Sequence, residues 1–457
     1  MSTKKLVLSI LCLVLTIVPE LQAQEKSSQA NIIFIFADDW GYGDLSLHGS
    51  TWVKTPNLDQ MAREGIDFAN FTVNSPVCSP SRTAVMTGQF PARNSIHQHF
   101  AGVGSNQKRG MPDWLDPRVP LLPKLLQEAG YSTGHFGKWH LGSCSDSPSE
   151  DVYGYDAYAT FNGSGINQIK ASGLASVDHA VNFINKNHDK PFFVNLWLHE
   201  THLPHFPLEK YLQQFKDLDE RKRVYASVIA EGDEGVGRIL NLLKELNLDE
   251  NTLVVFSSDN GPEAARDESH KIHKKNNPDG LGGYYSVGES GGLIGQKRSL
   301  YAGGIRVPFI VRWPGVVPEG ISDVNSVMTA VDLLPTFLDI AGVKLPENFN
   351  PDGESVVSAL KGEGFKRTKN IYWEWKGGIS KEYTWPSIGI RDGKWKLITN
   401  KELQRTELYN IENDWAESKD MAADYPGVVK ELTKKLDAWK ASLPTEPKES
   451  CVSKKRD

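Results

Sequence analysis

Short apolar segments alternate with segments of helical periodicity along most of the chain. Continuous apolar runs, typical of strands buried on both faces, occur at Ile32–Phe36, Tyr131–His135, Phe192–Leu198 and Thr252–Phe256. Between and before them, apolar residues recur at helical spacing near Leu58–Ala62, Leu121–Leu126, Val177–Ile184 and Val224–Leu243, the last being one long helix or a broken pair. This alternation predicts an α/β fold, in which a large, mainly parallel (mixed) sheet is sandwiched between helices.

The pattern changes in the last quarter of the chain. A further helix is expected around Val331–Ala341, with Gly342 just beyond its end. The composition then becomes polar through Pro346–Gly364, as is typical of a connection between domains. We therefore expect a large domain over residues 24–345 and a smaller α+β subdomain over residues 346–457.

A hairpin signal marks the smaller subdomain. The strand-like segments Ser387–Arg391 and Lys394–Ile398 flank Asp392-Gly393, a dipeptide that favours a two-residue turn. An amphipathic pattern at Val428–Trp439 predicts a final helix. The subdomain is therefore expected to be a small antiparallel sheet with one helix packed on it.

The N-terminal segment has the features of an export signal. Two lysines precede a short apolar run, and a small residue, Ala23, follows it. This arrangement predicts a secretory signal peptide over residues 1–23 and a secreted or periplasmic protein. The apolar run is too short for a membrane span, and we expect no span later in the chain.

Composition and charge exclude some partners. The 457 residues are 39% hydrophobic and 24% charged, with a formal net charge of −6. These values are typical of a globular protein and do not favour nucleic acid or a membrane surface as the main partner. Three cysteines follow the expected signal peptide, so at least one stays free, pairs between chains or is chemically consumed, while pairing of Cys144 with Cys451 stays open.

Two pairs of oxygen-bearing side chains directly follow predicted strands. Asp38-Asp39 come after the first strand, and Asp259-Asn260 come after Thr252–Phe256. Such residues are also common as turn and cap residues. However, ligands of open parallel sheets bind beyond the carboxyl ends of the strands, and two pairs placed alike favour a shared cation. Carboxylate and amide oxygens suit one Ca²⁺ ion, with Mg²⁺ less favoured, better than Zn²⁺.

Cys78 stands at the expected start of a helix. Pro80 suits the first turn of a helix that runs from about Ser81, and the free amides of that turn would favour an anion beside residue 78. A thiolate is equally favoured there, so a cysteine hydrolase and a structural buried cysteine are alternatives. The long irregular stretch Gly261–Ser299 is expected to border an active site.

The segment CSPSRTAVMTG, which begins at Cys78, resembles the signature of the type I, formylglycine-dependent sulfatases of the alkaline phosphatase superfamily. Five further segments are similar to that family in family order: FADDWGYGD (36–44), GKWHLG (137–142), PHFP (204–207), SSDNG (257–261) and GQKRSLYAGGIRVP (295–308). The resemblance covers nearly all of the chain after Asn31. It departs from the family at Ala302, where a glutamate is usual.

The resemblance implies how the site would work. Cys78 would be oxidised to formylglycine in the unfolded chain by a formylglycine-generating or sulfatase-maturing enzyme. The metal ligands would be Asp38, Asp39, the modified Cys78, Asp259 and Asn260. Arg82 would hold the hydrated aldehyde, Lys138 and Lys297 would neutralise the sulfuryl oxygens, His140 would be the base, and His205 would be the acid for the leaving alcohol. Histidine suits the last two tasks because its pKa lies near working pH.

The substrate is expected to be a sulfated saccharide, such as a polysaccharide fragment. Other polar residues are candidates for contacts with it: His97, His99, Asp113, Trp114, His199, His202, Glu263, His270 and His273. Two alternatives stay open: a phosphonate or phosphate ester hydrolase of the same fold, and a catalytically silent glycan-binding protein.

Overall fold

The first predicted strand lies at the centre of the structure. The computed structural model describes residues 29–142, 144–163, 169–170, 174–273, 280–377 and 386–456. Within it, β1 (Asn31–Ala37) is buried along its whole length and pairs in parallel with β6 on one side and β7 on the other. Burial on both faces explains why the segment is continuously apolar rather than alternating. The predicted strand is confirmed, whereas the expected signal peptide lies outside the described residues.

The main sheet is large and mixed, as predicted. Within the described residues it contains eight strands in the order β5-β4-β6-β1-β7-β8-β2-β9. The first five of these are parallel, β8 is antiparallel to both its neighbours, and β9 is parallel to β2. Besides β1, its strands are β2 (Ile66–Phe68), β4 (Ser132–Lys138), β5 (Ala157–Phe161), β6 (Phe192–Trp197), β7 (Thr252–Ser258), β8 (Phe309–Arg312) and β9 (Ile321–Asp323). The short strands β3 (Phe71–Thr72) and β10 (Met328–Thr329) pair beside it.

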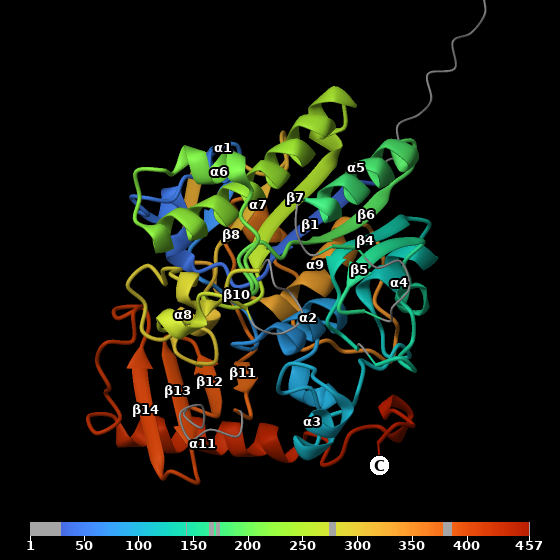
Figure 1. The fold of residues 1–457 in the computed structure, drawn as a ribbon. Coiled ribbons are helices and arrows are strands. Elements are labelled where there is room, and N and C mark those ends of the chain that lie inside the picture. Colours follow the sequence, from blue (N-terminus) through green and yellow to red (C-terminus); the bar gives the residue numbers. More distant parts are fainter. Residues whose placement is uncertain are drawn as a thin grey trace, which may run out of the picture.

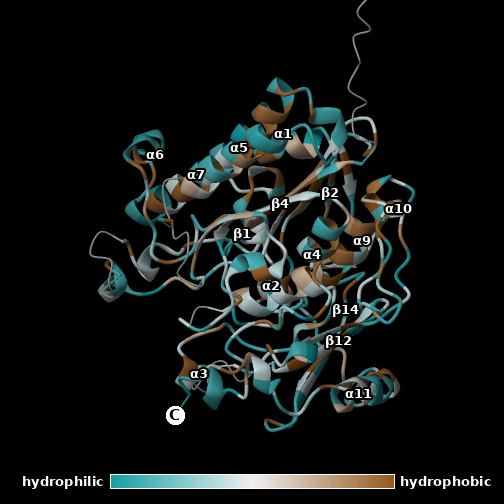
Figure 2. Cartoon of the chain, turned by 90° about the vertical axis from the view of Figure 1, so that its right-hand side faces the viewer, coloured by the Kyte–Doolittle hydropathy of each residue, from teal (hydrophilic) through white to brown (hydrophobic). Residues whose placement is uncertain are grey.

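Helices cover both faces of this sheet (Figure 1, Figure 2). One layer contains α1 (Pro56–Arg63), α5 (Ala175–Asn187), α6 (Glu209–Gln214) and α7 (Glu220–Glu245). The other contains α2 (Cys78–Thr87), α4 (Leu122–Glu128) and α9 (Leu333–Ile340). Alternate residues of β1 serve the two layers, because Ile33 and Ile35 pack with the first layer while Phe34 and Phe36 pack with the second.

Most helix predictions are confirmed, with three refinements. The pattern near Val224–Leu243 is a single helix, α7, and not a broken pair. The helix after Cys78 begins at Cys78 itself rather than near Ser81, because Pro80 fits within its first turn. The polar connection after residue 346 contains a short helix, α10 (Val357–Leu360), and α3 (Val103–Lys108) lies in a region where no helix was predicted.

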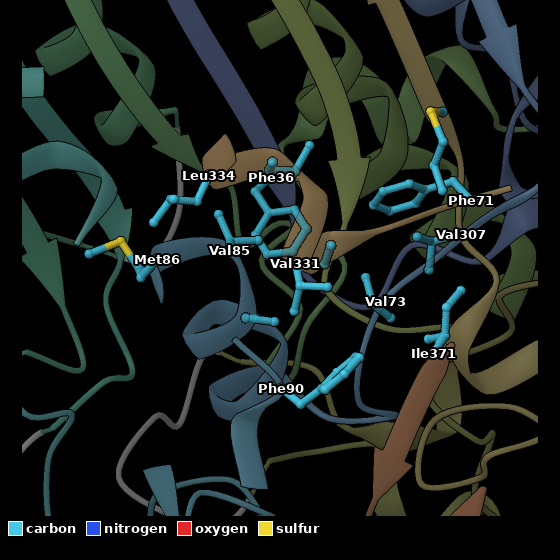
Figure 3. Close-up of a cluster of buried hydrophobic side chains, with 14 of the residues drawn as sticks. Phe36, Phe71, Val73, Val85, Met86, Phe90, Val307, Val331, Leu334 and Ile371 are labelled. Carbon is cyan, nitrogen blue, oxygen red and sulfur yellow. The ribbon is translucent and has the colours of Figure 1, made fainter. Parts of the chain in front are cut away.

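Packing against β1 holds α2 under the carboxyl end of the sheet. Figure 3 shows Val85 of α2 between Phe36 of β1 and Leu334 of α9, all of them buried. Burying a side chain of this size contributes about 1.5–3 kcal/mol. The helix that begins at Cys78 is therefore held rigidly against β1, the strand that Asp38 directly follows.

The C-terminal part forms the predicted antiparallel sheet with one helix. The sheet contains β11 (Ile371–Glu374), β12 (Ile388–Asp392), β13 (Trp395–Asn400) and β14 (Arg405–Asn410), and α11 (Pro426–Ala441) packs on it. The hairpin is present, but its turn lies one residue later than predicted. Asp392 ends β12 and pairs with Trp395, so the two turn residues are Gly393, which has a φ of 55°, and Lys394. The α8 helix (Ala302–Ile305) lies between this sheet and the main one in Figure 1.

One hydrophobic cluster runs from the main sheet into the C-terminal sheet. It includes Phe34 and Phe309 of the main sheet together with Trp373, Leu408 and Leu432 of the C-terminal part. A shared core of this kind resists independent movement of the two parts. No helix within the described ranges is both long and apolar enough to cross a bilayer.

Candidate active site

Parallel pairing of β1 with β7 brings the two polar pairs together. Ala37 and Ser258 are opposite each other in the register, so the residues that follow both strands emerge at the same edge of the sheet. The backbone N–H of Asp39 donates to Asp259 Oδ1 at 3.2 Å, and Asn260 Nδ2 donates to Asp39 Oδ1 at 2.7 Å. The structure thus places these side chains in one buried cluster.

The backbone of Asp39 is strained. Its φ of 67° lies in the left-handed region, which costs a non-glycine residue about 1–2 kcal/mol. Such conformations persist where the surrounding structure over-determines them, and they gather at functional sites. Here the hydrogen bond to Asp259 holds the backbone while the Asp39 carboxylate faces the cluster.

Cys78 faces the same cluster from the start of α2. Its Sγ lies 3.5 Å from Asp38 Oδ1 and accepts a hydrogen bond from Lys138 Nζ at 3.3 Å. Asp38, Asp39, Cys78 and His202 each offer one ligand atom, and these four atoms lie within 4.8 Å of one another. A single metal ion could therefore contact Cys78 and both aspartates.

Three basic side chains surround these carboxylates. Arg82 contacts Asp259 Oδ2 through Nη2 at 2.6 Å and through Nε at 3.1 Å. Lys138, at the end of β4, donates to Asp38 Oδ2 at 2.6 Å, and Lys297 donates to Asp39 Oδ2 at the same distance. The aromatic ring of Trp197, 4.8 Å below the guanidinium carbon of Arg82, supports that side chain from behind.

The environment of Cys78 does not favour a thiolate. Burial raises the pKa of the thiol, and the charges of Asp259 and Asp38 raise it further, against the opposing effect of Lys138 and Lys297. A cysteine hydrolase needs the thiolate as its nucleophile. The unmodified cysteine is therefore poorly suited to that chemistry.

The cluster has the composition of a divalent-metal site. Burial raises the pKa of Asp39 to about 7, although Lys297 opposes the shift. Asn260 Oδ1 is buried and has no hydrogen-bond partner among the described residues. An unpaired buried oxygen and a crowded set of carboxylates are both relieved by a bound cation, so the residues present fit such an ion.

His140 has one ring nitrogen in a hydrogen bond and one without a partner among the described residues. It follows β4, two residues after Lys138, and its Nε2–H donates to the carbonyl of Phe100 at 3.0 Å. Its Nδ1 is buried without a partner among the described residues, so this nitrogen carries the free lone pair. Burial and the charge of Lys138 hold the pKa of His140 well below its usual value, which keeps the ring neutral.

His202 lies beside the carboxylates, whereas His205 contacts Ser286 and Leu281. His205 Nε2 lies 3.1 Å from Ser286 Oγ, and the His205 backbone pairs with Leu281. In contrast, His202 Nε2 lies 4.0 Å from Asp39 Oδ2 and its side chain is one-quarter exposed. The geometry therefore favours His202 over His205 as the imidazole that meets a bound ester.

A sequence signal for His202 existed. His199 and His202 follow β6, which neighbours β1, as Asp38 and Asp39 follow β1 itself. The rule that ligands bind beyond strand carboxyl ends selects both histidines. His199 Nδ1 indeed lies 2.8 Å from Asp38 Oδ2.

Three of the remaining candidates for substrate contacts have partners elsewhere in the structure. Asp113 pairs with Arg456, and Trp114 forms a bridge to Gly142, so both have structural partners. His97 Nε2 bonds to the backbone carbonyl of Arg109.

Two other candidates lie near the basic groups. Glu263 Oε2 is 3.5 Å from Lys297 Nζ, and the His99 ring is 6.3 Å from the His140 ring. His270 pairs with Asp267 on the exposed side of the long loop, part of which lies outside the described residues.

The structure bears on two questions that the sequence left open: whether Cys144 pairs with Cys451, and what replaces the usual glutamate at Ala302. Cys144 and Cys451 are both free thiols in this structure. At Ala302, the backbone N–H donates to Glu417 Oε2 at 2.8 Å, so a carboxylate from the C-terminal part contacts this position.

Family comparisons cover most of the chain. Residues 30–343 match the family model described as Sulfatase. Residues 288–442 match a second one, described as N-sulphoglucosamine sulphohydrolase, C-terminal.

Several curated proteins are similar over most of their length. N-acetylgalactosamine-6-O-sulfatase of Bacteroides thetaiotaomicron is 26% identical over 513 residues, covering 91% of this chain and 94% of that protein. N-acetylgalactosamine-6-sulfatase of Canis lupus familiaris is 32% identical, covering 73% of this chain and 66% of that protein. Human arylsulfatase A is 29% identical, covering 75% of this chain and 70% of that protein.

Solved structures share the whole architecture. The crystal structure of Ps i-CgsB in complex with k-i-k-neocarrahexaose has a TM-score of 0.76 and 28% identity, covering 92% of this chain and 96% of that one. The phosphonate monoester hydrolase of Agrobacterium radiobacter has a TM-score of 0.64 and 20% identity, covering 90% and 96% of the two chains. The second likeness concerns the fold alone.

Proposed function

Because the chain belongs to the sulfatase family and is a sulfuric ester hydrolase, we propose that it removes sulfate from saccharides with a formylglycine made from Cys78. The observation that carries this proposal is the position of Cys78. Its side chain faces Asp38 and Asp39 at the carboxyl edge of the sheet, with Lys138 in contact. The saccharide class is supported by two of the curated relatives, whose names describe them as N-acetylgalactosamine-6-sulfatases.

A resident Ca²⁺ would be held by the oxygens of Asp38, Asp39, Asp259 and Asn260 together with the modified residue 78. Hard oxygen ligands favour Ca²⁺, with Mg²⁺ second because it demands a more regular geometry. When bound, such an ion supplies Lewis-acid polarisation of nearby oxygens. The unpaired Asn260 Oδ1 and the raised pKa of Asp39 support this assignment.

The basic side chains would bind and orient the reacting groups. Lys138 and Lys297 are buried beside Cys78 or the aspartates, where fixed positive charge stabilises sulfuryl oxygens without reorganisation. Arg82, one turn after Cys78 in α2, would hold the hydrated aldehyde that supplies the oxygen nucleophile. Its double contact with Asp259 keeps the guanidinium in place.

Two histidines would move the protons. His140, neutral and with its Nδ1 lone pair free, would accept the proton of the second hydroxyl of the aldehyde hydrate. We assign the acid that protonates the leaving alcohol to His202, in place of His205, because His202 borders the cluster and is partly exposed toward solvent. A partly exposed acid can reach an alcohol that belongs to a large saccharide.

Modification of Cys78 would precede folding. The side chain is 2% exposed in the folded protein, which leaves no access for a maturing enzyme. A formylglycine-generating or sulfatase-maturing enzyme would therefore act on the extended chain. Intact mass of the peptide around Cys78 measures this directly, as loss of H₂S and gain of one oxygen atom.

A panel of esters tests the proposed reaction. We expect aryl sulfates and sulfated oligosaccharides to be hydrolysed with a higher kcat/KM than phosphate or phosphonate esters that have the same leaving group. The chain retains Cys78, Arg82 and Lys297, which a silent glycan-binding protein would not need. Faster hydrolysis of the phosphate or phosphonate esters would reject the sulfatase proposal. If protein that carries formylglycine bound the sulfated oligosaccharides without hydrolysing them, the catalytically silent glycan-binding protein would be favoured.

Removal of the metal is expected to lower activity strongly. Treatment with a chelator should reduce kcat for an aryl sulfate by about 100-fold, because the polarising charge at the site is lost. Addition of Ca²⁺ should restore the rate more fully than Mg²⁺. The melting temperature should fall in parallel, since a ligand that binds only the native state stabilises it.

The metal prediction has a simple control. Asp39→Asn, which removes one carboxylate from the cluster, should have low activity that responds weakly to either chelator or Ca²⁺. Full activity of chelated protein that contains no divalent metal by elemental analysis would contradict the metal assignment.

A further inference from the structure

We propose that Glu417, in the C-terminal part of the chain, is a positioning residue for the catalytic centre. It lies in the segment after β14 and is 2% exposed. It contacts the segment that follows Lys297 and, through that segment, the backbone next to Asn260. This inference rests on the proposed function of Lys297 and Asn260.

Three consecutive residues beyond Lys297 are each hydrogen-bonded to the C-terminal part. Lys396 Nζ of β13 donates to the carbonyl of Leu300 at 2.7 Å. The hydroxyl of Tyr301 donates to Glu407 Oε2 of β14 at 2.6 Å. The backbone N–H of Ala302 donates to Glu417 Oε2 at 2.8 Å. We call these three contacts the 300–302 contacts.

Glu417 is the centre of this arrangement. Its second oxygen, Oε1, accepts a hydrogen bond from Lys396, so one carboxylate joins two of the three contacts. Both side chains are buried, Lys396 being 3% exposed. Removing one charge of a buried pair leaves the other uncompensated, which is strongly unfavourable. Glu417 is also held at a φ of 63°, a strained conformation for a non-glycine residue.

Ala302 begins α8, and α8 touches the metal-site backbone directly. The N–H of Gly261, the residue after Asn260, donates to the carbonyl of Gly304 at 3.0 Å. A Cβ placed on Gly261 would lie 1.9 Å from the carbonyl oxygen of Gly303, so no side chain fits between the two segments. A shift of α8 would therefore move the backbone that carries Asn260.

Lys297 is coupled to the same two segments. Its backbone N–H donates to the carbonyl of Pro262 at 3.0 Å, and the N–H of Gly303 donates to the carbonyl of Ile294 at 2.7 Å. One hydrogen-bonded unit thus contains the segment around Lys297, the α8 helix, and the residues that directly follow Asn260. Because Ala302 has no polar side chain of its own, the carboxylate that fixes this unit comes from Glu417, 115 residues later in the chain.

The test compares Glu417→Gln with a matched variant, Asp249→Asn. Glutamine keeps the shape of the side chain but removes the charge that Lys396 needs. Asp249 pairs with Arg312 at 2.7 Å and precedes β7, at the opposite end of that strand from Asp259. Both variants lose a carboxylate that pairs with a largely buried cation, but only the first disturbs the 300–302 contacts.

In Glu417→Gln we expect kcat for an aryl sulfate to fall by about 10-fold, with little change in KM, since misplacement of reacting groups by less than 1 Å has effects of this size. The dissociation constant for Ca²⁺, measured by calorimetry, should rise several-fold. Backbone amide hydrogen exchange should accelerate in residues 259–263 and 294–305. Asp249→Asn should lower the melting temperature while kcat, Ca²⁺ affinity and exchange in these two segments stay at wild-type values.

A second variant, Glu417→Asp, keeps the proposal testable if Glu417→Gln does not fold. Glu417→Asp keeps the charge near Lys396, but its carboxylate is one methylene too short to reach Ala302. It should show the same faster exchange and a smaller loss of kcat. Unchanged exchange in residues 259–263 and 294–305 in a folded Glu417 variant would overturn the positioning role. Hydrogen exchange tests the positioning role even if the wild-type protein has no sulfatase activity. A lack of sulfatase activity would refute the proposed function instead.

Discussion

Replacing Cys78 by alanine is expected to lower kcat/KM for sulfate esters by at least about 10⁴-fold, because the variant lacks any precursor of the nucleophile. The fold should survive, since the Sγ atom packs among polar groups of the site and its removal leaves only a small cavity. Circular dichroism and the melting temperature measure that survival, and initial rates on an aryl sulfate measure the loss.

Cys144→Ala is the matched control for this change. Cys144 is also a free thiol, but it is partly exposed and is not one of the described residues whose ligand atoms gather in the carboxylate cluster. Its replacement should leave the rate unchanged. If Cys78→Ala retained more than about one-tenth of wild-type activity, a factor worth only about 1.4 kcal/mol, residue 78 would not be the nucleophile.

Replacing His202 by alanine should lower kcat for a sulfated saccharide by about 10³-fold, within the range of general acid catalysis. A sugar hydroxyl is a poor leaving group and needs a proton as the bond to sulfur breaks. The same change should have a much smaller effect on 4-nitrophenyl sulfate, whose leaving group needs no proton. This dependence on the leaving group identifies an acid rather than a binding residue.

His205→Ala separates the two histidines. His205 is buried against Ser286, so its loss should reduce stability but should leave the ratio of saccharide to aryl sulfate rates unchanged. If His205→Ala, and not His202→Ala, selectively lost activity on the saccharide, the assignment made from the PHFP segment would be right and the geometric one wrong.

Local sequence signals predicted most of the architecture. The apolar runs at β1, β6 and β7 were clear because strands buried on both faces tolerate few polar residues. The C-terminal hairpin was clear from Asp392-Gly393, because few residues accept the backbone of a two-residue turn, although the turn itself is formed by Gly393 and Lys394. The small helix α8 and the edge strand β9 had no such signal, since they are too short to show a period.

The same distinction applies to the site. Asp38, Asp39, Asp259 and Asn260 could be grouped from sequence, because each pair directly follows a strand and parallel strands end at one edge. The same rule marks His202 as a candidate, but it does not by itself exclude His205. The two residues lie three positions apart in an irregular segment, where no periodicity tells which side chain turns inward.

The amino-acid sequence by itself determined the main buried strands and the longer helices, the segments that carry chemistry, and the family that these segments resemble. Tertiary structure alone decided that His202 borders the carboxylates and that Glu417 contacts Ala302. The reason is physical: periodicity and turn chemistry act over a few residues, whereas these contacts join segments more than 100 residues apart. Such contacts are set by how the whole core packs, and no local pattern encodes them.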